Sequence, residues 1–250
     1  MDVERRGALA ILRMRAGRAN AINRAFLDAL GALLDDLVAR PPGALILTAE
    51  GKAFCAGLDL PALVDLPVPA LADFIRYFAA TMLRIFTLPF PVVAAVNGHA
   101  VAGGCVLALQ ADQRLMAIGE GRFGLSEVRL GIGLPAAVVE TLRCQVPAAT
   151  LFPVAAEGGL FTAEEALRLG LVHAVVEPDV LLERAMERAA ALAAVPAAAF
   201  AQVKATLRRP ALAAIAAAGP ADAASWVQTF QTPDAQKLLR DVVARLTARG

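Results

Sequence analysis

A glycine-rich junction in the middle of the chain constrains the fold more than any other stretch. Pro91–Val96 is a short apolar run of valine and alanine, and Asn97-Gly98 follows it as a turn signal. Gly103-Gly104 then opens a second apolar run. This order predicts a strand covered on both faces, a tight turn, and a helix with a glycine-rich first turn. The unshielded N–H groups of such a helix start favour a partial negative charge on a phosphate, a carboxylate or an enolate-like oxygen.

Short apolar strands alternate with helices through the first half of the chain, which predicts an α/β architecture. Beyond about residue 134 strand signals almost vanish, and helices should dominate. The remaining strands are expected at 7–14, 44–48, 112–118 and 172–176. Helices are expected at 24–39, 70–88, 135–145, 147–156, 162–169, 178–194, 196–208, 220–230 and 234–248.

The last of these helices has a clear start, because Thr232 can cap it and Pro233 suits its first position. It carries an apolar stripe, which packs either on the protein's own core or on another subunit. The stripe consists of Leu238, Leu239, Val242, Val243 and Leu246.

Length and composition fit one large domain, or one domain with an appendage. The 250 residues are 58% hydrophobic but only 5% aromatic, so small side chains should bring helices and strands close together. A mean hydropathy of +0.60 hints at apolar surface buried between subunits. The net charge of +1 argues against a nucleic-acid partner or a cationic membrane surface.

The cysteines and the apolar runs indicate a cytoplasmic protein. Cys55, Cys105 and Cys144 show no metal-ligand spacing, and they are expected to be reduced, largely buried thiols. The N-terminal apolar run is too short and too charged for a signal peptide. The apolar region 89–109 is interrupted by polar residues and glycines, so it does not qualify as a membrane span.

Few residues suggest chemistry on their own. His99 and His173 have no evident partner in the sequence and are expected to be structural. Gly103-Gly104 lacks the lysine of a phosphate-binding loop and the spacing of a dinucleotide site. Glu127 lies among apolar residues, where its charged form would be disfavoured, so it is a candidate general acid or base. The alternative is a surface glutamate at a helix start.

Four ordered motifs together resemble the crotonase family, also called the enoyl-CoA hydratase/isomerase family. They are Ala19–Asn23, Gly51–Leu60, Ala95–Cys105 and Phe123–Gly131, and Phe161–Val172 resembles the family's next segment. The resemblance covers almost the whole chain. It implies an α/β fold, a crotonase-type spiral of ββα units with a helical C-terminal region. Residues 1–195 would form the core with the acyl-CoA site, and residues 196–250 would build a homotrimer or hexamer.

The resemblance also implies the site. The thioester oxygen of an acyl-CoA would be held by the backbone amides of Leu58 and Gly103, with Glu127 as the acid/base. No cofactor or metal is implied, since CoA is part of the substrate. Substrate-binding positions by the same match are Ala56, Gly57, Asp59, Leu60, Gly104 and Ser126, with Lys52 and Arg18 as weaker candidates near the CoA phosphates.

One position separates the activities of the family. Hydratases carry a second glutamate just after the Gly-Gly-Cys segment, but here that position is Val106. A valine can neither position water nor donate a proton. Moving a double bond by shuttling one proton from C2 to C4 needs only Glu127. The sequence therefore resembles the Δ3,Δ2-enoyl-CoA isomerases of fatty-acid β-oxidation.

Two alternatives remain open. The chain could be another crotonase-type enzyme, such as a hydratase with relaxed requirements or a decarboxylase, or it could be a non-catalytic acyl-CoA-binding protein on the same scaffold. A helical stripe in the segment 70–88 could line an acyl tunnel, although packed core is the simpler interpretation. The stripe consists of Phe74, Phe78, Met82 and Phe86.

Overall fold

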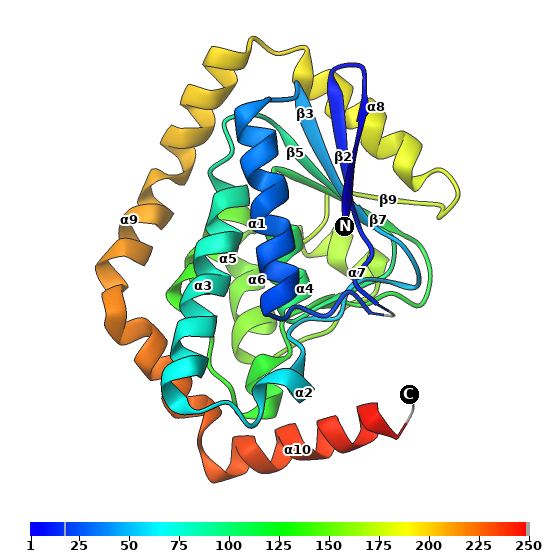
Figure 1. Ribbon diagram of the computed structural model, residues 1–250. Helices are drawn as coiled ribbons and strands as arrows, with labels where there is room; N and C mark the ends of the chain where they lie inside the picture. Colours follow the sequence, from blue (N-terminus) through cyan, green and yellow to red (C-terminus); the bar gives the residue numbers. More distant parts are fainter. Residues whose placement is uncertain (18, 249–250) are drawn as a thin grey trace.

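The computed structural model describes residues 1–17 and 19–248 (Figure 1). Its strands are β1 (Asp2–Arg6), β2 (Leu9–Met14), β3 (Ala44–Ala49), β4 (Ala53–Cys55), β5 (Val92–Val96), β6 (His99–Val101), β7 (Gln113–Ala117), β8 (Phe123–Gly124) and β9 (Ala174–Val176). Its α-helices are α1 (Arg24–Ala39), α2 (Leu60–Leu63), α3 (Val68–Phe86), α4 (Gly103–Leu109), α5 (Ala136–Gln145), α6 (Ala148–Leu151), α7 (Ala163–Arg168), α8 (Leu181–Ala193), α9 (Ala197–Phe230) and α10 (Pro233–Thr247). A 3-10 helix, η1 (Glu127–Leu130), and a π-helix, η2 (Phe152–Ala156), complete the set.

The larger sheet has six strands in the order β1-β2-β3-β5-β7-β9. Only the β1–β2 pair is antiparallel, and all other neighbours are parallel. Strands β2, β3 and β5 are mostly apolar at successive positions because both faces of the sheet are covered there. Leu9 and Ile11 pack with α8 on one face, whereas Ala10 and Leu12 belong to the main core on the other.

The smaller sheet has three parallel strands in the order β4-β6-β8. Each of them directly follows a strand of the larger sheet along the chain and precedes a helical segment. The repeating units are therefore β3–β4–α2, β5–β6–α4 and β7–β8–η1. This arrangement confirms the predicted α/β fold, a spiral of ββα units followed by a helical C-terminal region.

Two glycines allow the β5–β6–α4 unit to approach the backbone of the preceding β3–β4 segment closely. A Cβ atom on Gly98 would lie 2.1 Å from the carbonyl oxygen of Lys52, and one on Gly104 would lie 1.9 Å from that of Cys55. Neither contact is possible for a real side chain. The glycine-rich junction is therefore required by packing, as well as by the turn it makes.

The structure corrects one prediction about the C-terminal helices. The expected break at residues 209–219 is mostly absent, because α9 continues through Pro210 and an alanine-rich segment with high helix propensity. The break falls at Gly219 alone, with φ 59° and ψ −159°. Pro220 then starts the second half of α9, as expected for a proline at a helix start.

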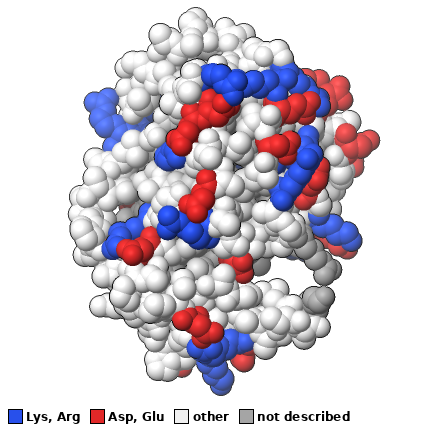
Figure 2. Space-filling view, viewed as in Figure 1, with Lys and Arg blue, Asp and Glu red and all other residues white. Residues whose placement is uncertain are grey.

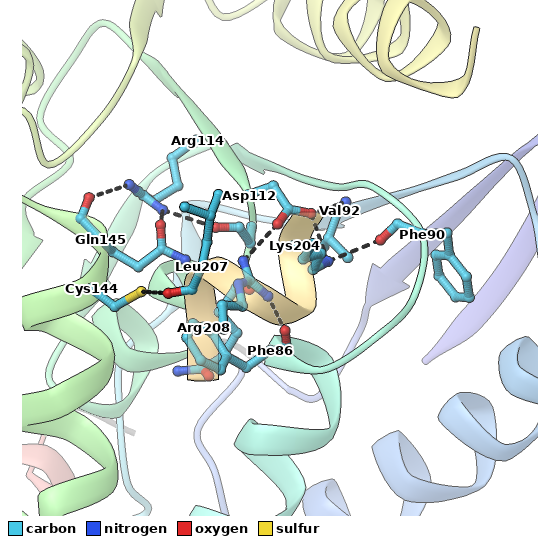
Figure 3. A network of polar contacts seen from close by, with 12 residues as sticks. Phe86, Phe90, Val92, Asp112, Arg114, Cys144, Gln145, Lys204, Leu207 and Arg208 are labelled. Atoms are coloured by element: carbon cyan, nitrogen blue, oxygen red, sulfur yellow. Dashed lines mark hydrogen bonds and ion pairs between the residues drawn. The ribbon is translucent and has the colours of Figure 1, made fainter. Parts of the chain in front are cut away.

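A buried polar network fixes α9 to the core (Figure 3). The Asp112 carboxylate precedes β7 and accepts hydrogen bonds from Lys204 Nζ at 2.8 Å and Arg208 at 2.6 Å. Lys204 also donates to the Phe90 carbonyl at 3.0 Å, and Arg208 donates to the Phe86 carbonyl. One carboxylate thus holds two cations of the same helix face, one turn apart.

Four strands and the solvent exposure of one cysteine differ from the expectations. Strand β1 was not predicted because four of its five residues are charged and its side chains are half-buried or exposed. The three strands of the smaller sheet were not predicted because two or three residues carry too little periodicity to stand out from a loop. Cys55 and Cys105 are buried as predicted, but Cys144 is exposed. It lies near the end of α5 on the solvent side.

The surface and the helices give two further observations. Basic and acidic side chains are interspersed on the face shown in Figure 2, and the outer edge formed by α9 is mostly uncharged. Within residues 1–17 and 19–248, no single helix is long and apolar enough to cross a membrane. The bent pair of α8 and α9, with an angle of 101° between them, passes that test by length and composition only.

Candidate active site

The loop after β4 is held in place by the segment that precedes α1. Ile22 donates to the Gly57 carbonyl at 2.8 Å and accepts from the Asp59 amide at 3.0 Å. Leu58 lies between Gly57 and Asp59, and the backbone groups of successive residues along a strand edge point to alternate sides. The amide of Leu58 therefore points away from Ile22. Asp59 is tied down as well, because its Oδ2 accepts from Asn23 Nδ2 at 3.0 Å.

The start of α4 supplies a second free amide. Gly103 is the first residue of the helix, so its N–H has no acceptor within the helix. The preceding Ala102 has φ 53° and ψ −125°, a conformation that costs an alanine about 1–3 kcal/mol. Its amide donates to Gly124 O at 2.9 Å, and its carbonyl accepts from Val106 N at 3.0 Å. These two hydrogen bonds hold Ala102 in its strained conformation, which orients the N–H group of Gly103.

The two amides belong to neighbouring peptides. A Cβ atom on Gly57, which has φ +96°, would lie 3.2 Å from Gly103 N, and one on Gly103 would lie 3.4 Å from Leu58 Cδ2. Leu58 and Gly103 both line the same cavity. Together they form a pair of donors able to hold one oxygen atom that gains negative charge.

The cavity has a volume of about 450 Å³ and mostly apolar walls, which is within the usual range for a small-molecule site. Its polar side chains are few: Asp59, Ser126, Glu127 and Arg129. Of the predicted site residues, Ala56, Leu58, Asp59, Leu60, Gly103, Ser126 and Glu127 line it. Gly57 and Gly104 do not, and each instead permits a close backbone approach.

Glu127 is the most perturbed group in the cavity. The residue is half-buried, but its carboxylate oxygen Oε2 is shielded from solvent and has no hydrogen-bond partner among the described residues. Burial raises the pKa of Glu127 to about 7, although amides of Glu127 and Ser126 offset part of this effect. A carboxyl group with such a pKa can both take and return a proton near neutral pH.

Val106 stands beside these groups on α4. It lines the cavity and is only 2% exposed. Its side chain offers no hydrogen bond. Within the described part of the chain, Asp59 and Glu127 are the acidic residues of the cavity lining, and Asp59 already has a partner.

The other residues considered from the sequence lie elsewhere. His99 and His173 do not line the cavity, and the Nδ1 atom of each accepts a backbone N–H, from Arg122 and Arg114 respectively. Burial raises the pKa of Cys105 well above its ordinary value, so it stays a thiol. Lys52 is exposed outside the cavity lining, and Arg18 lies outside the described residues.

Sequence reasoning missed much of the apolar wall. Of the stripe on α3, only Phe78 lines the cavity, and Phe74, Met82 and Phe86 are packed core. The C-terminal helices contribute Trp226, Val242 and Leu246. No local signal could have assigned these residues, because their place depends on how α9 and α10 fold back over the core. Among the described residues, no group of three or more His, Cys, Asp or Glu side chains could hold a metal ion.

Comparisons with known proteins agree on one family. Residues 4–246 match the profile described as enoyl-CoA hydratase/isomerase. A probable enoyl-CoA hydratase of Mycobacterium bovis is 32% identical over 210 residues, which are 83% of this chain and 80% of that protein. A carnitinyl-CoA dehydratase of Salmonella arizonae is 37% identical over 193 residues, 76% of this chain and 72% of that protein. The human mitochondrial delta3-delta2-enoyl-CoA isomerase superposes with a TM-score of 0.94 at 28% identity, over 99% of this chain and 98% of that one.

Proposed function

The chain belongs to the enoyl-CoA hydratase/isomerase family, the crotonase superfamily of enzymes, and from this premise we propose that it is a Δ3,Δ2-enoyl-CoA isomerase. It would move the double bond of a 3-enoyl-CoA to the 2-trans position during fatty-acid β-oxidation. The observation that carries the proposal is a single unpartnered carboxylate, Glu127, in an apolar cavity where Val106 replaces the second acid of a hydratase.

The proposed reaction uses one base and two amides. Glu127 removes a proton from C2 of the substrate, and the negative charge spreads to the thioester oxygen. The N–H groups of Leu58 and Gly103 stabilise that oxygen, each by about 3 kcal/mol if they act like other oxyanion donors. Glu127 then returns the proton to C4, which moves the double bond by one position. The raised pKa of Glu127 supports both steps, because it makes the carboxylate a stronger base toward the C2 proton and leaves the carboxyl group able to return that proton to C4.

Hydration is the second candidate, because similar proteins such as the one from Mycobacterium bovis carry the name hydratase. Adding water across a double bond needs a group that positions the water while another donates a proton. Val106 cannot take part, and Asp59 is engaged by Asn23. These two observations favour isomerisation over hydration.

Replacing Glu127 by Gln tests the proposal. The Glu127→Gln variant should lose isomerisation of 3-hexenoyl-CoA by at least a hundredfold, the lower end of what a positioned base contributes, while it still binds acyl-CoA. The matched control is Glu120→Gln, which changes an exposed carboxylate on the β7–β8 connection and should keep full activity. Unchanged turnover in Glu127→Gln would sink the proposal.

A side-by-side assay separates the competing functions. The wild-type protein should convert 3-hexenoyl-CoA faster than it hydrates crotonyl-CoA. Faster hydration would contradict the argument from Val106. Saturable binding without a double-bond shift across an enoyl-CoA series would instead indicate a non-catalytic acyl-CoA-binding protein.

We also propose that residues 196–250 mediate self-association. The first half of α9 exposes apolar side chains, with Val203 52% and Leu207 68% accessible, beside a groove of about 430 Å³. Covering these side chains in a trimer would remove apolar area from water. Sedimentation should then give a mass of three or six chains, and Leu207→Glu should reduce it. A monomer at micromolar concentration would rule the proposal out.

A further inference from the structure

The cavity has an open end and a closed end. At the open end lie exposed residues from the loop after β4, from α2, from η1 and from α10, namely Ala56, Pro61, Arg129 and Leu246. Several other lining side chains are almost inaccessible to solvent. Among them Phe78 at 2%, Val138 at 3% and Trp226 at 4% come from three different helices, and we assign these three to the closed end. The helices are α3, α5 and α9, which contact one another, with α9 along the outer edge of the molecule (Figure 1).

Trp226 is held rigidly from behind. Its ring packs on Phe230 with 5.1 Å between the ring centroids. Its carbonyl accepts from Thr229 Oγ1 at 2.8 Å, and the same hydroxyl accepts from Gly133 N at 2.9 Å. The loop that follows η1 is therefore tied to the turn of α9 that carries the indole. A wall fixed in this way does not yield easily to a longer ligand.

The direction of an acyl chain in this cavity follows from charge. The nucleotide part of CoA carries phosphates, which cannot enter an apolar pocket without a large desolvation cost, so it must stay at the open end. With the thioester oxygen at the amides of Leu58 and Gly103, the carbons beyond C4 have only the closed end to occupy. They then run toward Phe78 and Trp226.

We propose that Trp226, together with Phe78, is the end wall of the acyl channel and sets the longest straight chain that the enzyme accepts. The inference rests on the proposed function in taking an acyl-CoA thioester as the ligand, but it does not depend on which reaction follows. Each methylene group buried before the wall should raise affinity roughly fourfold. Methylene groups beyond the wall should add nothing.

The chain offers a direct reporter, because Trp226 is its only tryptophan. The test titrates the wild-type protein with saturated straight-chain acyl-CoAs from butyryl to palmitoyl and follows tryptophan emission and affinity. Short esters should bind without changing the emission. From one chain length onward the emission should shift, and at that length the affinity should stop rising. Emission that does not depend on chain length would overturn the inference.

A pair of phenylalanines on one helix provides a matched control. Phe78 and Phe74 are both buried on α3, one turn apart, but only Phe78 lines the cavity. Phe78→Ala and the milder Trp226→Leu should move the affinity plateau to longer esters, with roughly fourfold tighter binding per added methylene. Phe74→Ala should leave the plateau in place. Identical plateaus in the two phenylalanine variants would contradict the assignment.

Saturated esters keep this test separate from the proposed isomerisation, since they contain no double bond to move. A protein that fails to isomerise but shows the plateau would retain the end wall and lose only the proposed reaction. A protein that isomerises without a plateau at any length would lose the end wall and keep the reaction.

Discussion

The buried carboxylate of Glu127 should make the protein less stable as the pH rises. The ordinary pKa of a glutamate is 4.5, and burial raises that of Glu127 to about 7 in the folded state. Between these values the unfolded chain has already released the proton and the folded chain still holds it. The unfolded state then binds fewer protons, so the free energy of unfolding falls with increasing pH. Above pH 7 both states are ionised and the effect is complete.

The size of this effect follows from the two pKa values. They differ by about 2.5, and each tenfold change in an ionisation constant corresponds to 1.36 kcal/mol, so ionised Glu127 costs about 3 kcal/mol of stability at pH 8. Glu127→Gln has no charge at any pH and is free of this cost. Relative to wild type, the variant should gain little at pH 4.5 and up to about 3 kcal/mol at pH 8.

Urea unfolding of both proteins at a series of pH values from 4.5 to 8 measures this difference. The gain should grow through the interval and then level off, whereas Glu120→Gln, a change at an exposed carboxylate, should follow the wild type at every pH. A difference that does not vary with pH would refute the reasoning. In wild-type enzyme the same ionisation should lower kcat/KM about tenfold for each pH unit below 7.

Two further pairs of substitutions test the packing of the glycine-rich junction and the anchoring of α9. Gly104→Ala would put a Cβ atom 1.9 Å from the backbone oxygen of Cys55, so we expect the free energy of unfolding to fall by about 3 kcal/mol and the melting temperature to fall with it. The control Gly31→Ala inside α1, where the nearest atom is 3.4 Å away, should be neutral or stabilising. Equal melting temperatures for the two variants would count against the close approach. Lys204→Met removes one of the two cations that pair with the half-buried Asp112 carboxylate and should cost about 3 kcal/mol in urea unfolding. Arg240→Ala breaks an exposed ion pair and should cost about 0.5 kcal/mol or less, so similar costs for the two variants would contradict the anchoring role of the network.

The sequence was most informative where the signal is local. The apolar run before Asn97, the glycine pair and the cap at Thr232 each reflect a constraint on neighbouring residues, and the structure has the strand, the helix start and the capped helix there. The Thr232 hydroxyl accepts from Ala235 N, as a helix cap should. The α/β fold and its spiral arrangement followed from such signals and from the family resemblance.

Other features depended on contacts that no single stretch contains. Leu58 pairs with Ile22 through an isolated parallel β-bridge between two segments that are far apart in sequence. A strand of one residue has no periodicity to detect. The place of Trp226 in the cavity depends on the break at Gly219 and on the anchoring of α9 by Asp112. Because these are tertiary effects, composition and spacing could indicate the helix but not what it covers.

The C-terminal helices also bear on how the protein is made. Trp226, Val242 and Leu246 complete the lining of a cavity whose other walls are formed earlier in the chain. A nascent chain that ends before α9 would present Phe78 and its apolar neighbours to water, a state that favours aggregation. We therefore expect chains truncated before residue 196 to need chaperones and to precipitate without them. The helices that line the ligand cavity are thus also the last elements to cover the apolar core during synthesis.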